Sequence, residues 1–212
     1  LGPDAGRHQL DLYFFDNDSV NYYRTNRRFT ELFYMLGRKR EQILNVIHSQ
    51  TVFKGLNVGF DFRRITTEGF LARQYVYGNN FNAFLRYSSP KQKYHILANG
   101  SYNRLSSEEN GGVLNESDVN NNSSLTQNMP VKIQQAETRW GNGSLFLQQS
   151  FDLKRDSAIR KSFHRLSHLI LYENRYFLYE DFDPINSFYS SRLYGQRTLD
   201  STSFKSIRSE IT

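Results

Sequence analysis

Apolar and polar residues alternate along much of the middle of the chain. In residues 56–64, LNVGFDFRR, every second side chain is apolar, and polar or small residues fill the positions between. Because successive side chains of a strand point to opposite faces, a period of two predicts strands with one apolar and one polar face. Similar alternation, with a few exceptions, occurs in residues 79–89, 93–103 and 144–153. The polar positions carry Asn, Gln, Arg and Asp, which suit water better than a dry core.

Short clusters of turn-forming residues separate the alternating stretches. They are DNDS at 16–19, GRKR at 37–40, FKG at 53–55, TTEG at 66–69, YGNN at 77–80, SSPK at 88–91 and WGNG at 140–143. Short turns between neighbouring strands predict an antiparallel up-and-down meander. Divided in this way, the chain contains roughly ten to twelve strand candidates.

Residues 29–50 have two possible interpretations. Their apolar positions can be placed on one face of a helix, but Gly37 and the charged residues after it interrupt that pattern. We therefore predict two strands joined by a turn.

The stretch from Ser106 to Pro130 is polar, rich in Asn and Ser, and without a period. Outer-membrane barrels pair short turns on one side with long loops on the other, so this stretch is expected to be an external loop. The alternative is an ordinary disordered surface insertion. The expected organisation is a single β-barrel segment over residues 1–212, with the long polar external loop at about 106–130.

The composition supports a barrel wall. The chain has 17 Phe, 14 Tyr and one Trp, yet it is polar on average. A barrel wall combines these properties because half of its strand residues meet lipid and half meet a wet lumen. No run of 18 apolar residues occurs, which excludes a transmembrane helix. The absence of Cys excludes disulfides and thiolate chemistry.

The polar positions of the alternating strands are candidates for a lumen-facing surface. They are Asn57, Asp61, Arg63, Asn82, Arg86, His95 and Asn99. An Arg facing lipid at the midplane costs about 2–4 kcal/mol, so these Arg residues should point inward. Arg73 should point inward or lie near an interface. Inward Arg residues would favour anions, or they would pair with Asp61, Asp152 or Glu residues across the lumen.

Tyrosines near the expected strand ends are candidates for an interfacial aromatic girdle. They are Tyr34, Tyr75, Tyr77, Tyr87, Tyr94 and Tyr172. The alternative is aromatic packing in the core of a soluble β protein.

The sequence offers no catalytic, cofactor-binding or metal-binding residues. His164 and His168 share a face of a strand about 13 Å apart, which is too far for one metal ion. Asp181 and Asp183 precede Pro184 and are expected in a solvated turn. We therefore expect no enzyme and no cofactor. The Lys and Arg residues are spread along the chain despite a net charge of +6, so no nucleic-acid partner is expected.

Several motifs resemble the Bacteroidetes-type putative porin family, which consists of outer-membrane β-barrels. The matching residues are Phe29-Thr30-Glu31-Leu32, Tyr34, Gly37, Gln42, His48-Ser49-Gln50 and Glu68-Gly69, with further similarity at 109–116 and 129–140. The resemblance implies an integral barrel in the bacterial outer membrane and a diffusion role, and it supplies no catalytic residues. Family members are longer than this chain, so an incomplete portion of a transmembrane antiparallel β-barrel is expected.

Three functions remain open at this point. The first is a porin-like barrel that lets small polar solutes diffuse, with outer-membrane lipid around it. The second is a non-conducting barrel that anchors or partners other outer-membrane or secretion subunits. The third is a soluble β-sandwich binding module, which would also show alternating strands.

Overall fold

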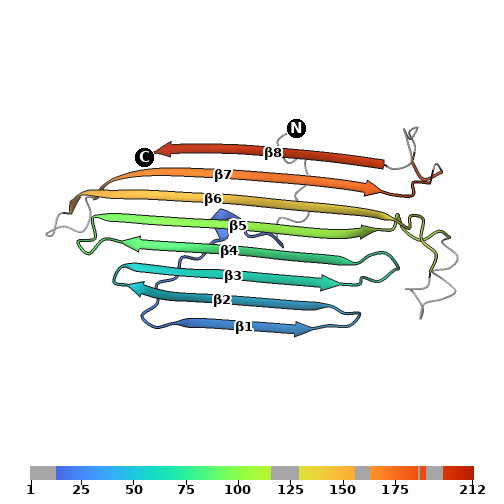
Figure 1. Ribbon diagram of the computed structural model, residues 1–212, viewed down its shortest axis with the longest axis horizontal. Helices are drawn as coiled ribbons and strands as arrows, with labels where there is room; N and C mark the ends of the chain where they lie inside the picture. Colours follow the sequence, from blue (N-terminus) through green and yellow to red (C-terminus); the bar gives the residue numbers. More distant parts are fainter. Residues whose placement is uncertain (1–12, 116–128, 156–162, 186, 190–197) are drawn as a thin grey trace.

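Eight strands of the computed structural model form one antiparallel sheet, in which their order in space is their order in the chain (Figure 1). The structure describes residues 13–115, 129–155, 163–185, 187–189 and 198–212. The strands are β1 (Phe29–Leu36), β2 (Gln42–Phe53), β3 (Leu56–Thr67), β4 (Val76–Ser88), β5 (Tyr94–Glu109), β6 (Ala136–Arg155), β7 (Phe163–Asp181) and β8 (Thr198–Ile211). A short 3₁₀ helix, η2 (Asn17–Ser19), precedes them. The predicted all-β meander is confirmed.

Residues 29–50 form two strands and not a helix, as expected. The connection between β1 and β2 closes with a hydrogen bond of 2.7 Å from the Gly37 amide to the Glu41 carbonyl. The next connection, between β2 and β3, is only Lys54 and Gly55. Gly55 has φ of +95°, and a Cβ there would lie 2.2 Å from the Ser88 carbonyl oxygen, so this turn requires glycine.

Two of the expected turns are wrong. YGNN at 77–80 lies inside β4, and WGNG at 140–143 lies inside β6. Gly141 serves packing and not a turn: a Cβ there would lie 2.0 Å from Cε1 of Tyr176, so only glycine leaves room for that ring. The described sheet therefore has eight long strands and fewer than the ten to twelve expected; β6 alone has 20 residues.

The connections differ in length at the two ends of the strands. At the strand ends drawn on the left of Figure 1, residues 54–55 join β2 to β3 and residues 89–93 join β4 to β5. At the other ends, residues 37–41 join β1 to β2 and residues 68–75 join β3 to β4, and the separations in sequence between β5 and β6 and between β7 and β8 are longer. Strand β5 continues to Glu109, so the first residues of the expected loop at 106–130 are strand, while residues 116–128 lie outside the described residues. We call these the short-turn end and the long-connection end.

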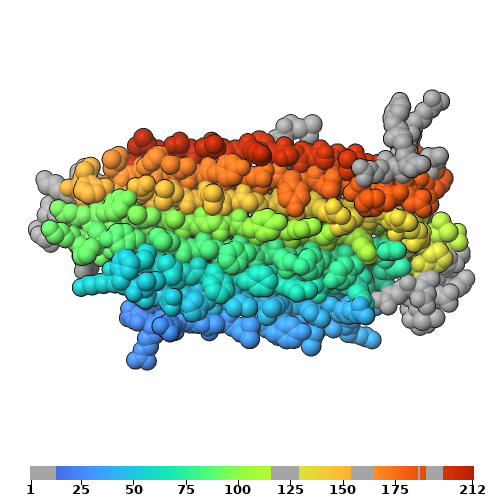
Figure 2. Space-filling view, in the orientation of Figure 1, coloured from blue at the N-terminus to red at the C-terminus, as the bar shows by residue number. Residues whose placement is uncertain are grey.

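The two faces of the sheet differ sharply. The register places Asn57, Asn82, Asn99 and Asn142 on one face, here the polar face. The other, apolar face carries Phe60, Phe81, Leu145 and Ile207, which are among its large side chains. Figure 2 shows the apolar face as a continuous surface over β2 to β7 that no further described element overlays.

Burial is reversed relative to a water-soluble protein. Buried side chains in the described part are largely polar, and Asn103 and Asp181 are fully buried. Large apolar side chains are exposed instead: Leu145 is 63% and Ile207 77% exposed. A β-sandwich buries its apolar face against a second sheet, and the described residues form only one sheet. The arrangement therefore does not fit the soluble β-sandwich that the alternation left open.

The sheet is not closed. Among the described residues, β1 pairs only with β2, and β8 pairs only with β7, so both outer strands keep a free edge (Figure 1). An open sheet of this kind agrees with the expected incomplete portion of a barrel. Within the described ranges, no helix is both long and apolar enough to cross a membrane.

Candidate functional site

The seven candidates for a lumen-facing surface all lie on the polar face. The register pairs Asn57 with Arg86 and Asp61 with Asn82 across β3 and β4. The other three, Arg63, His95 and Asn99, fall on the same face because their partners are Asn80, Ser88 and Phe84. Strand pairing thus brings residues that are up to 42 positions apart in sequence onto one surface.

Five of the six girdle candidates lie on the apolar face. Tyr34 and Tyr77 are close to the long-connection end, and Tyr87 and Tyr94 are close to the short-turn end. Tyr172 lies in the middle of β7, opposite Leu145. The sixth candidate, Tyr75, precedes β4 in the connection 68–75.

Residues 13–28 cross the polar face, and we call them the crossing segment. Figure 1 shows this stretch running across the strands before it enters β1. At its start, the amide of Phe15 donates to Oδ1 of Asn103 over 2.8 Å, and Nδ2 of Asn103 donates back to the Phe15 carbonyl over 2.9 Å. Nδ2 of Asn80 also donates to the Tyr13 carbonyl. Buried amide side chains thus bind the backbone of this segment as a neighbouring strand would.

The middle of the crossing segment is fixed by Asn99 and Phe84. The Tyr22 hydroxyl donates to Oδ1 of Asn99 over 2.7 Å, and Nδ2 of Asn99 donates to Oδ1 of Asn17 over 2.9 Å. The rings of Tyr22 and Tyr23 pack on Phe84, with centroids 6.1 and 5.8 Å away. Burial raises the pKa of the Tyr22 hydroxyl, which favours the protonated donor over the phenolate.

Only one feature of the sequence points to the crossing segment. Phe84 is an aromatic residue at a position that otherwise alternates with polar side chains, and it is 4% exposed beneath the segment. An aromatic side chain on a polar face indicates that another part of the chain packs over it, but nothing in the sequence indicates which part. Residues 13–28 have no period, so their position on the sheet could not be predicted.

Several arginines of the polar face are paired with carboxylates. Nε of Arg165 lies 2.7 Å from Asp152 across β6 and β7, and Nε2 of His95 lies 3.3 Å from the same carboxylate. Arg175 pairs with Glu173 over 3.3 Å, and Arg208 pairs with Glu210. The sequence left open that Asp152 pairs with an inward arginine such as Arg63 or Arg86. Asp152 does pair with an arginine, but that arginine is Arg165.

The two arginines of the candidate surface, Arg63 and Arg86, have different surroundings. The guanidinium of Arg63 lies 4.9 Å from the ring centroid of Phe15, in a cation–π arrangement. Arg86 lines a cavity of about 220 Å³ together with Arg24 and Lys54. Arg73 is not on a strand: it lies in the connection 68–75, 3.5 Å from Glu108.

The expected solvated turn at Asp181 and Asp183 is wrong for Asp181. This residue ends β7 and is fully buried, because the Tyr189 hydroxyl and the Asp183 amide both donate to its carboxylate. Asp183 is exposed, as expected. His168 contacts Oγ of Ser209 at 3.1 Å, whereas the side chain of His164 lies outside the described residues. In the described ranges, no group of three His, Asp or Glu residues could hold a metal ion.

A family model described as "Putative porin" matches residues 2–212. No curated protein and no solved structure matches the chain.

Proposed function

The chain belongs to the putative porin family. From this premise we propose that it forms part of the wall of a β-barrel in a bacterial outer membrane. In this proposal small polar solutes diffuse passively along the polar face, and lipid covers the apolar face. The role requires no catalytic step and no cofactor.

The reversal of burial between the two faces carries the proposal. Leu32, Leu145 and Ile207 are 68%, 63% and 77% exposed on the apolar face. Exposed apolar patches of a water-soluble monomer rarely exceed a few hundred Å², whereas a barrel presents a continuous apolar band to lipid. The polar face, with its amides and charges, is suited to an aqueous passage.

The ends of the strands fit the same role. Barrels of this type have short turns on the periplasmic side and longer loops on the outside. By this rule the short-turn end faces the periplasm. Tyr34 and Tyr77 at one end, and Tyr87 and Tyr94 at the other, have positions suited to the two membrane interfaces.

Reconstitution tests the proposal directly. The protein is folded into liposomes, and swelling in small sugars or amino acids is compared with empty liposomes; planar-bilayer conductance gives an independent measurement. We expect solute entry, ion conductance and a folded form that migrates differently on a gel before and after heating. A protein that stays monomeric and soluble without detergent would contradict the barrel itself.

One observation favours the second function, a non-conducting barrel that anchors other outer-membrane or secretion subunits. The crossing segment covers part of the polar face and would narrow a passage along it. Deletion of residues 13–28 separates the two functions. An intact protein that conducts supports the porin role; one that conducts only after the deletion supports the anchor.

A further inference from the structure

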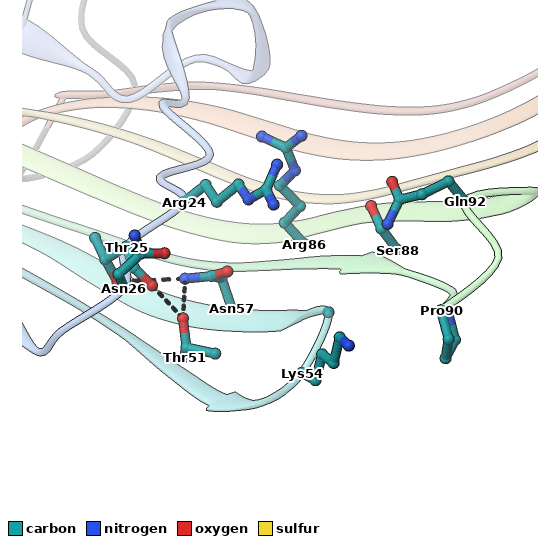
Figure 3. A pocket seen from close by; sticks show the side chains of 11 residues that line it. Arg24, Thr25, Asn26, Thr51, Lys54, Asn57, Arg86, Ser88, Pro90 and Gln92 are labelled. Carbon is teal, nitrogen blue, oxygen red and sulfur yellow. Dashed lines mark hydrogen bonds between the residues drawn. The ribbon is translucent and has the colours of Figure 1, made fainter.

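A cationic cavity lies between the crossing segment and the short-turn end of the polar face. It has a volume of about 220 Å³, far above the roughly 10–15 Å³ that one water molecule requires. Three parts of the chain form it: the crossing segment, the β2–β3 hairpin and the β4–β5 hairpin (Figure 3). We propose that this cavity binds small oxyanions, either carboxylates or phosphate, through Arg24, Lys54 and Arg86. This proposal rests on the proposed function, because it names the solute class that the passage would select.

The charges in the cavity are unbalanced. Arg24, Lys54 and Arg86 contribute three positive charges, and none of the lining residues is acidic. Figure 3 shows Arg24 of the crossing segment and Arg86 of β4 among the side chains that line the cavity. Two guanidinium groups that share a cavity repel each other, and an oxyanion between them would replace this repulsion with charge-assisted hydrogen bonds.

Three other arginines on the same face differ from these two, whereas Arg63 lies against the ring of Phe15. Arg165, Arg175 and Arg208 each have a carboxylate partner on the polar face. No carboxylate of the described residues pairs with Arg24 or Arg86. Arg165, Arg175 and Arg208 pair with carboxylates of the protein itself. For Arg24 and Arg86, a solute would supply the anionic partner.

Hydrogen bonds connect the parts of the chain that form the cavity. Asn57, which is 6% exposed, donates to Oγ1 of Thr25 over 3.3 Å and to Oγ1 of Thr51 over 2.9 Å. These bonds, dashed in Figure 3, hold the residue next to Arg24 against the β2–β3 hairpin. The Ser88 amide donates to the Gly55 carbonyl over 2.8 Å and joins the two hairpins. The crossing segment and the two hairpins are therefore joined to one another around the cavity.

Neutral donors complete the lining. Ser88, Asn26 and Gln92 are neutral polar residues of the lining. The Ser88 hydroxyl also contacts Nδ1 of His95, and Nε2 of Gln92 also donates to the Ser89 carbonyl. Oxyanions accept several hydrogen bonds at once, so a mixture of guanidinium, ammonium and amide donors suits them. A cation would meet three positive charges in the same place and would be excluded.

Direct binding to the folded protein in detergent micelles tests the site. Inorganic phosphate and acetate are titrated separately at low ionic strength by isothermal titration calorimetry. We expect saturable binding at millimolar concentrations that weakens as sodium chloride is added. Binding of phosphate alone identifies a phosphate site, and binding of acetate as well identifies a general oxyanion site. Absence of saturable binding for both would overturn the proposal.

Variants separate the site from general positive charge. Arg86→Gln and Arg24→Gln should each weaken binding about tenfold, as expected for loss of one charge-assisted contact. Arg86→Lys should retain more affinity than Arg86→Gln, which a purely structural role would not predict. Arg208→Gln is the matched control on the same face and should bind as the unaltered protein does. Equal binding by Arg86→Gln and the unaltered protein contradicts the site.

Conductance distinguishes this proposal from the porin role. If the protein binds phosphate but conducts no ions, the oxyanion site is supported and the proposed porin role is contradicted. If the protein conducts ions but binds neither anion, the porin role is supported and the oxyanion site is contradicted.

Discussion

The side chain of Asn103 holds the start of the crossing segment on the polar face. It is fully buried, and its amide both donates to and accepts from the backbone of Phe15. A hydrophobic residue could not replace it, because two backbone groups of the crossing segment would lose their partners. Each buried group left without a hydrogen bond costs about 1–3 kcal/mol.

Asn103→Ala should therefore release the start of the crossing segment while leaving the sheet folded. We expect faster cleavage of residues 13–28 by an added protease, measured by mass spectrometry of the fragments. Asn21→Ala is the matched control, because Asn21 is an exposed residue of the same segment. Equal cleavage of the Asn103 variant and the unaltered protein would show that this amide does not hold the segment.

Two glycines on β6 offer a direct test of packing. A Cβ at Gly141 would lie 2.0 Å from Cε1 of Tyr176, whereas a Cβ at Gly143 would have no atom closer than 3.9 Å. Gly141→Ala should destabilise the fold by about 1–3 kcal/mol through overpacking, and Gly143→Ala should be tolerated. Urea titration of the folded protein in detergent measures both. Similar stability losses for both variants would exclude ring packing as the reason for Gly141.

The hydroxyl of Tyr22 should make the docking of the crossing segment sensitive to alkaline pH. Burial raises the pKa of this hydroxyl above the ordinary value of 10. Its stabilising contribution is thus complete below pH 10 and is lost as the pH rises further. Protease cleavage of the segment should accelerate above about pH 10. Tyr22→Phe should weaken docking by about 0.5–1.5 kcal/mol through loss of the bond to Asn99, and it should show a smaller change with pH.

At the scale of the elements, the alternation predicted the strands and their faces well. The pattern in 56–64 fixed which side of β3 is polar, because a one-residue slip would move every side chain to the other face. The pattern could not assign the glycines of YGNN and WGNG, since glycine marks a turn and a close side-chain contact equally well. The cavity was also beyond prediction, because it needs the crossing segment, whose position depends on contacts between residues up to 127 positions apart.

At the scale of the whole molecule, the two free edges govern stability. Within the described part of the chain, β1 and β8 each leave one edge without a neighbouring strand, and the backbone groups of such an edge cannot be satisfied by lipid. In a barrel these edges must pair with further strands. Until these edges are paired, the backbone amides of the central strands are expected to be better protected from hydrogen exchange than those of the edge strands.

Hydrogen exchange of the 212-residue chain in detergent should follow this gradient. We expect the slowest amide exchange in β4 to β6 and the fastest in β1 and β8, because the edge strands have a neighbour on one side only. Mass spectrometry of peptides after timed exchange measures the profile. Equal protection of the edge and central strands would indicate that the edges are already paired, for instance between two copies of the chain.

The cationic cavity lies at one end of the strands only, beside the turns at 54–55 and 89–93. A passage with fixed positive charge at one mouth is electrically asymmetric, since anions accumulate at that mouth and cations are depleted there. Such a passage behaves as an ionic diode: its current depends on the sign of the applied voltage as well as on its size. Rectification would therefore reveal, from electrical recordings alone, in which orientation the protein has entered a bilayer.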